Sequence, residues 1–207
     1  KGAIERIEIS DVGDVKYTVI GGARPIGLTG SAVVDAIAGL HSSGILDDSG
    51  KLIKRENIKR LRVGEDGLLE FVIAYKDETA IDKDIVLTQK DVREVQLAKA
   101  AIKTGVSILM KKLGVNEEDL NVVYVAGAFG FFLNPISAIR IGLLPKIDVD
   151  KIRIVGNTAG MGARAMLLSE EMRKEAVELV ERIEYVELAT EPDFQTKFMA
   201  SMNILMD

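Results

Sequence analysis

The start of the chain alternates apolar and polar residues over two short segments, residues 4–9 and 15–20. A period of two is typical of β-strands, and residues 11–14 between them (Asp-Val-Gly-Asp) have the composition of a tight turn. We therefore predict an antiparallel hairpin. Short apolar segments predict further strands over residues 68–75, 84–87, 152–155 and 185–188.

Helices are predicted where apolar residues recur every three or four positions. The longest begins at Thr88, which resembles the first residue of a capping box with Asp91, and it stops at Gly114. Residues 169–183 predict an amphipathic helix, whereas the polar residues 55–66 are interpreted as a surface loop. The residues expected to face inward from the amphipathic helix are Met172, Ala176, Leu179 and Ile183. Further helices are expected over residues 32–40, 135–144, from 156 onward, and 192–202.

The most informative stretch is the apolar run from residue 122 to residue 130. It is rich in β-branched and aromatic residues, which predicts a strand buried on both faces in a mainly parallel sheet. Gly127 and Gly130 follow at its carboxyl end, where open α/β sheets bind their ligands and a backbone without a Cβ permits close approach. Two interpretations remain at this point, a nucleotide contact and an ordinary strand-to-helix turn.

Two other features have a similar ambiguity. Residues 27–31 (Gly-Leu-Thr-Gly-Ser) lead into a helix that Ser31 or Thr29 could cap, so this loop could hold an anion or simply end a turn. On the long helix, Gln96 and Lys103 share a polar face with Arg93 and Ala100. That face is either solvated or the lining of a nucleotide cleft.

Composition narrows the classes of function. The 207 residues fit one domain, and a net charge of −5 gives no electrostatic reason to expect nucleic acid or an anionic membrane as partner. Without cysteine, the chain supplies no disulfide and no cysteine-ligated iron–sulfur cluster. The single histidine, His41, is expected at a helix end. Asn134, Pro135 and Arg140 interrupt the apolar stretch 122–145, so we predict no membrane span.

The order of elements predicts an α/β fold with a mixed sheet, in which an antiparallel hairpin is followed by parallel βαβα units. This is the repeating unit of the acetate and sugar kinase, heat-shock cognate and actin (ASKHA) superfamily. More narrowly, five segments in order resemble the reductive activators of corrinoid proteins. They are residues 27–31, 87–102, 126–130, 137–145 and 156–163.

The resemblance implies an RNase H-like half of an actin-like ATPase fold. Members of that family are cytoplasmic proteins that use ATP hydrolysis to drive electron transfer from an iron–sulfur cluster to an inactivated corrinoid protein, which returns its cobalt to Co(I). By this resemblance the adenosine loop comprises Gly127, Ala128, Phe129 and Gly130. Gln96 and Lys99 are carried over by position as further nucleotide contacts, and the helix from Gly156 as a connecting helix of the interdomain hinge.

The chain also departs from the superfamily. It lacks the Asp-x-Gly-Thr loops that hold phosphates and the metal, so no catalytic residue and no metal ligand is expected here. Together with the missing initiator methionine, this suggests that residues 1–207 are the carboxyl-terminal domain of a longer protein, with ATP/Mg bound by the whole and the iron–sulfur cluster in another domain. The expected partner is a corrinoid protein, with a homodimer also considered. Two alternatives are a protein-interaction or dimerisation module, and half of a sugar or acyl kinase.

Overall fold

The computed structural model describes residues 1–204 and begins with the predicted hairpin. Strand β1 (Ala3–Ile9) pairs antiparallel with β2 (Val15–Val19), and Ile7 lies opposite Tyr17. On its other edge β1 pairs in parallel with the short β3 (Gly27–Leu28), which gives the order β2-β1-β3. The alternation in the sequence therefore identified both strands of the hairpin.

Helix α1 (Gly30–Ser42) packs on β1 and supplies much of the core. Ile37 and Leu40 are fully buried in the same core cluster as Ile4 of β1. Asp35 fastens the helix to the same strand, since its Oδ2 lies 3.4 Å from the Ile7 amide that donates to it. The core thus fixes where the amino terminus of α1 lies.

The second sheet is antiparallel, with the order β4-β5-β6. Its strands are β4 (Leu61–Val63), β5 (Leu69–Ala74) and β6 (Ile85–Thr88). The last two were predicted, but β4 falls within the segment that was interpreted as a loop. That interpretation was wrong because β4 is held by pairing with β5 and by the ion pairs of Arg62 with Glu70 and Asp84, at 2.8 and 2.6 Å.

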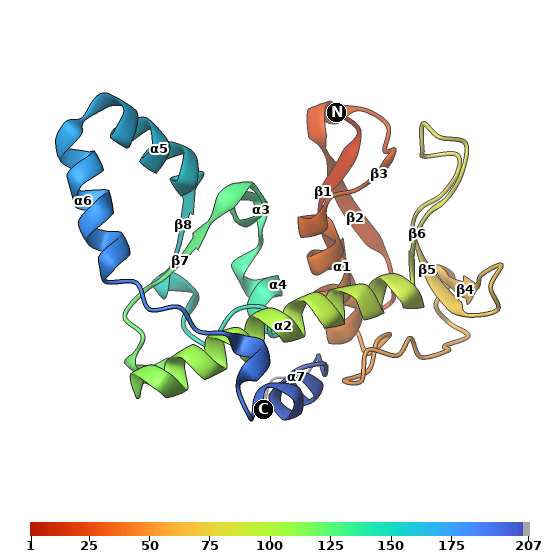
Figure 1. Ribbon diagram of the computed structural model, residues 1–207. Helices are drawn as coiled ribbons and strands as arrows, with labels where there is room; N and C mark the ends of the chain where they lie inside the picture. The colour runs from red at the N-terminus through yellow and green to blue at the C-terminus, as the bar shows by residue number, and fades with distance from the viewer. Residues whose placement is uncertain (205–207) are drawn as a thin grey trace.

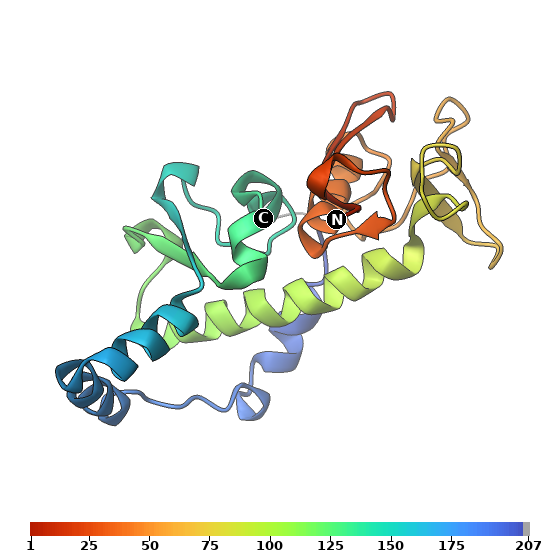
Figure 2. The ribbon, with the colours of Figure 1, turned by 90° about the horizontal axis from the view of Figure 1, so that it is seen from above.

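Helix α2 (Gln89–Leu113) is the long helix that runs below the sheets in Figure 1, with α7 on its other side, and Figure 2 shows its whole length. The predicted capping box is present, since Thr88 accepts from the Asp91 amide and Asp91 accepts from the Thr88 amide. Gly114 ends the helix in the left-handed conformation, with φ of 66°. Both predicted ends of the helix are therefore confirmed to within a residue.

The third sheet contains the apolar run. Strand β7 (Val123–Ala126) pairs in parallel with β8 (Ile152–Gly156), with α3 (Gly127–Phe132) and α4 (Pro135–Arg140) between them. The prediction of a strand buried on both faces was wrong, because among residues 1–204 only β8 pairs with β7 and the Tyr124 side chain is 66% exposed. Helix α4 starts at the predicted Asn134-Pro135 but ends at Arg140, ahead of the expected Pro145.

Helices α5 (Thr158–Leu168) and α6 (Glu170–Glu181) form a hairpin that extends from this sheet (Figure 1). The expectation of an inward apolar face on α6 was wrong: Ile183, just beyond the helix, is 71% exposed, and Leu179 is 48% exposed. The reason is that α5 is the main element against which α6 packs. No strand forms over residues 185–188, where Tyr185 is exposed and a 3-10 helix, Leu188–Thr190, follows.

Helix α7 (Phe194–Ala200) returns to pack against α2. This helix carries the stacked rings of Phe194 and Phe198, with centroids 5.9 Å apart. Short 3-10 helices also form between these elements, at Ile20–Gly22, Glu117–Asp119 and Val149–Lys151. The α/β class is confirmed, and the strands of residues 1–204 are spread over three sheets. No helix within residues 1–204 has the length and apolarity to cross a bilayer.

Candidate functional site

The amino terminus of α3 is the first part of the candidate site. The chain leaves β7 at Ala126, whose side chain offers no acceptor, so the first turn of α3 has no side-chain cap. Gly127 opens the helix with φ of 90°, which favours glycine. A Cβ built there would meet no atom within 4 Å, so the space beside this turn is open. Uncapped amide groups next to open space can receive a ligand's hydrogen-bond acceptors.

The amino terminus of α1 is already capped. Thr29 Oγ1 accepts from the Ala32 amide at 3.2 Å and lies 2.9 Å from the Ser31 hydroxyl, which donates to the Glu5 carbonyl. Of the two caps that the sequence allowed, the structure therefore selects Thr29. The local hydrogen bonds account for this loop as an ordinary cap.

The two glycine-containing loops meet in the structure. A Cβ at Gly30 would lie 2.8 Å from Cε2 of Phe129, so this aromatic ring rests against the first turn of α1. Phe129 nevertheless remains 51% exposed. The contact joins segments about 100 positions apart in the chain, and glycine at residue 30 is what gives the ring its room. Together the two helix starts form one wall.

Two more aromatic residues of α3 are exposed, and one of them, Phe131, lies beside Gly156 at the end of β8. Phe131 and Phe132 stand edge to face with ring centroids 5.1 Å apart, and about half of each side chain is exposed. Exposed aromatic rings are suited to stacking on a planar group or to covering by another protein surface.

Gln96 and Lys99 lie elsewhere, on the buried side of α2. The Gln96 amide donates to the carbonyls of Ser49 and Met202, at 3.0 and 2.7 Å. Lys99 is 1% exposed and donates to the Asn203 carbonyl. The interpretation of the polar face of α2 as solvated is thus wrong at Gln96, which is fully buried. Both side chains hold the segment after α7 on α2, so a nucleotide contact from either would require that segment to move.

Burial also changes the acidity of Lys99. Loss of water around the ammonium group is the main cause, and the charge of Lys103 adds to it, so the pKa of Lys99 falls to about 8. The Lys99 side chain therefore holds the segment after α7 in place by a hydrogen bond, but burial of its positive charge costs free energy.

The six predicted residues form two groups. Gly127, Ala128, Phe129 and Gly130 lie together at the start of α3, which packs against β7, β8 and α1. The partners of Gln96 and Lys99 lie in α2, in the loop at Ser49 and after α7. Within residues 1–204, no three or more His, Asp or Glu side chains are grouped so as to hold a metal.

The family model for the C-terminal domain of RACo, the ASKHA domain, matches residues 1–207. The corrinoid activation enzyme RamQ of Eubacterium limosum is 41% identical over 204 residues, which are 96% of this chain and 34% of that protein. The Co(II) methylated amine-specific corrinoid protein reductase of Methanosarcina barkeri is 25% identical over 184 residues, 88% of this chain and 30% of that protein.

A solved structure of a reductive activator for corrinoid, iron-sulfur protein superposes with a TM-score of 0.91 and 42% identity over 99% of this chain and 32% of that chain. The chain thus spans about a third of the length of the relatives it matches. Both the order of the five sequence segments and the fold agree with this assignment. The chain belongs to the family of the C-terminal ASKHA domain of the reductive activators of corrinoid proteins.

Proposed function

We propose that this chain forms the adenosine side of the nucleotide cleft in an ATP-dependent reductive activator. The observation that carries the proposal is the start of α3, where Gly127 at φ of 90° and an uncapped first turn border open space. The half-exposed ring of Phe129 stands at the same edge. Free amide donors beside an aromatic face suit an adenosine moiety, which presents acceptor atoms and a planar base.

The remaining parts of the nucleotide site would come from the rest of the parent protein. The residues present fit adenosine better than triphosphate, because the loop at α1 uses its hydroxyls within the protein. We therefore assign the phosphates and Mg²⁺ mainly to residues outside these 207. The iron–sulfur cluster is likewise assigned to a separate domain, since the chain has no cysteine.

The parent protein would then couple ATP hydrolysis to a one-electron transfer. One electron leaves the reduced iron–sulfur cluster and converts Co(II) of a corrinoid protein to Co(I), the state that accepts a methyl group. Coupling requires that ATP and the corrinoid protein each bind the open and closed forms of the activator with different affinity. The relatives named for corrinoid activation support this assignment of partner.

The test is the reduction of an excess of a Co(II) corrinoid protein by the full-length activator, with a low-potential electron donor present to reduce the iron–sulfur cluster after each turnover, followed by absorbance. We expect ATP to sustain formation of Co(I) over many turnovers and a non-hydrolysable analogue to support one turnover at most. The reason is that the closed form must be released by hydrolysis before the next reduction. Equal multiple-turnover rates with ATP and with the analogue would contradict the proposal.

One observation favours a second function, that of an interaction or dimerisation module. The α5–α6 hairpin exposes a series of apolar side chains, and a face of this kind commonly marks a protein contact. They include Leu167, Leu168, Val177 and Val180. If this were the chain's only role, substitutions at Gly127 would leave the ATP affinity of the full-length protein unchanged.

A further inference from the structure

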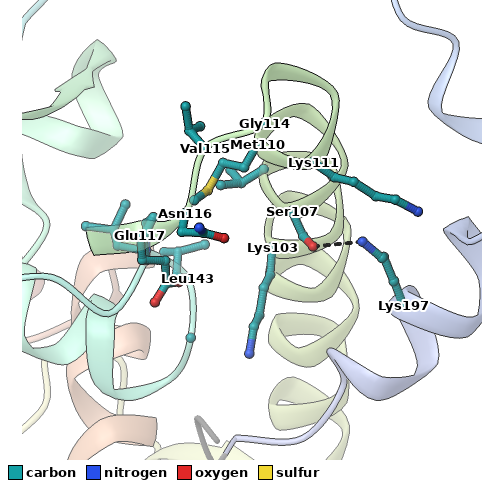
Figure 3. Close-up of a pocket in the computed structure, with 14 residues that line it drawn as sticks. Lys103, Ser107, Met110, Lys111, Gly114, Val115, Asn116, Glu117, Leu143 and Lys197 are labelled. Atoms are coloured by element: carbon teal, nitrogen blue, oxygen red, sulfur yellow. Dashed lines mark hydrogen bonds between the residues drawn. The ribbon is translucent and has the colours of Figure 1, made fainter. Parts of the chain in front are cut away.

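A cavity of about 580 Å³ lies against the carboxyl-terminal half of α2 (Figure 3). Lys103, Ser107 and Met110 line it from one face of the helix, where residues three and four positions apart are neighbours. The turn at residues 114–117 and the loop at residues 142–145 form one wall, and α7 forms the other. This volume lies within the range of small-molecule sites.

The charge of the lining is mainly positive. Among the described residues that line it, three are lysines and one, Glu117, carries a carboxylate. Lys111 is paired with Asp193 at 2.6 Å, but within the described residues neither Lys103 nor Lys197 forms an ion pair with a carboxylate. Lys197 instead donates to the Ser107 hydroxyl at 3.1 Å. In a chain with a net charge of −5, such a concentration of cations attracts anions.

The neighbouring Lys99 is affected by the same local excess of positive charge. After burial, the second cause of its lowered pKa is the positive charge of Lys103. The two residues are one helical turn apart, and an anion placed at Lys103 would relieve this repulsion. The cavity therefore favours a ligand with negative charge.

Part of the cavity lining is apolar. It includes Val106 and Met110 of α2, together with Val115, Leu143 and Leu144. Burial of apolar surface contributes to affinity only for a ligand that has an apolar part. A bare inorganic ion would leave these side chains without a partner, so the lining indicates a charged head on an apolar body.

We propose that this cavity binds a small organic anion, with a phosphate or carboxylate group held by Lys103, Lys197 and Ser107 and an apolar body against Met110 and Leu143. The site is separate from the nucleotide wall. It adjoins the turn before β7, whereas Gly127 follows the other end of that strand, and four residues of β-strand span roughly 13 Å. Because Lys197 belongs to α7, a bound ligand would also fasten α7 to α2.

The test uses methyl NMR of the full-length protein with labelled methionine, in which the Met110 signal is assigned from the Met110→Leu variant. The probes are phenyl phosphate, benzoate and inorganic phosphate. We expect phenyl phosphate or benzoate to shift the Met110 methyl signal saturably, with a dissociation constant on the order of 1 mM. The aromatic probe that binds more tightly identifies the head group. Inorganic phosphate should bind more weakly, because it lacks the apolar body.

The controls separate this site from general ion binding. Lys103→Gln and Lys197→Gln should each weaken the tighter probe roughly tenfold, as expected for loss of a charge-assisted hydrogen bond. Lys90→Gln, an exposed position on the same helix, should leave the affinity unchanged. All three variants should keep the wild-type ATP affinity.

Three results would overturn the proposal. The first is a Met110 signal that none of the probes shifts, and the second is an affinity that the double lysine variant leaves intact. The third is ATP binding that shifts Met110 and depends on Lys103, because the cavity would then be the nucleotide site itself. Loss of ATP binding in the Gly127 variant does not bear on any of these, so the two proposals fail independently.

Discussion

Replacing Gly127 with valine is expected to weaken ATP binding by the full-length protein roughly a hundredfold, or about 2.7 kcal/mol. The residue has φ of 90°, which a β-branched side chain does not tolerate, so the first turn of α3 must change its path. The new side chain would also occupy the open space beside that turn. Calorimetric titration with ATP, together with thermal unfolding to confirm that the variant is folded, measures the effect.

Gly67→Val provides the matched control. Gly67 has φ of 79°, a Cβ there would also meet no atom within 4 Å, and the residue lies in the turn between β4 and β5. Backbone strain is therefore similar at both positions, while only Gly127 belongs to the proposed wall. If both variants lost ATP affinity equally, strain would account for the loss and Gly127 would have no special role.

Lys99→Met is expected to increase the free energy of unfolding at pH 7 by about 1–2 kcal/mol. The difference between the ordinary pKa of 10.5 and the folded value of about 8 corresponds to an upper limit of about 3.4 kcal/mol for keeping the ammonium group charged in the folded protein. Methionine has a similar length and no charge. Part of the gain is lost because the Asn203 carbonyl no longer receives its hydrogen bond.

The pH dependence follows from the same residue. Because the folded pKa of Lys99 lies below its unfolded value, the unfolded chain binds more protons between about pH 8 and 10.5. The Lys99 contribution to wild-type stability should therefore rise with pH through this window. Urea unfolding at several pH values should show this rise in wild type and in the exposed-site control Lys90→Met, but not in Lys99→Met. Destabilisation by Lys99→Met at pH 7 would contradict the argument.

Elements specified by local signals could be predicted from the sequence. The hairpin follows from alternation and a turn, and both ends of α2 follow from a capping box and Gly114. Burial depends on what packs against an element, and a single sequence does not contain this. For that reason β7 was recognised as a strand while its exposed Tyr124 was not, and α6 was recognised as a helix while its exposed Leu179 was not.

The same distinction between local sequence signals and tertiary packing applies to the candidate site. The position of Gly127 after a strand was readable from the sequence, whereas the contact of Phe129 with Gly30 depends on how α1 and α3 pack. Nothing in the sequence around Gln96 and Lys99 indicated that their side chains would donate hydrogen bonds to the carbonyls of residues 202 and 203. Their assignment as nucleotide contacts remains a prediction.

The central claim is that the adenosine part of ATP lies against residues 126–130 and the start of α1. Photolabelling of the full-length protein with 8-azido-ATP, followed by identification of the modified peptide, locates the base directly. The account predicts label on Phe129 or its neighbours in α3, reduced by excess ATP and absent in Gly127→Val. Label found only outside residues 1–207, with the protein active in ATP-dependent reduction, would contradict it.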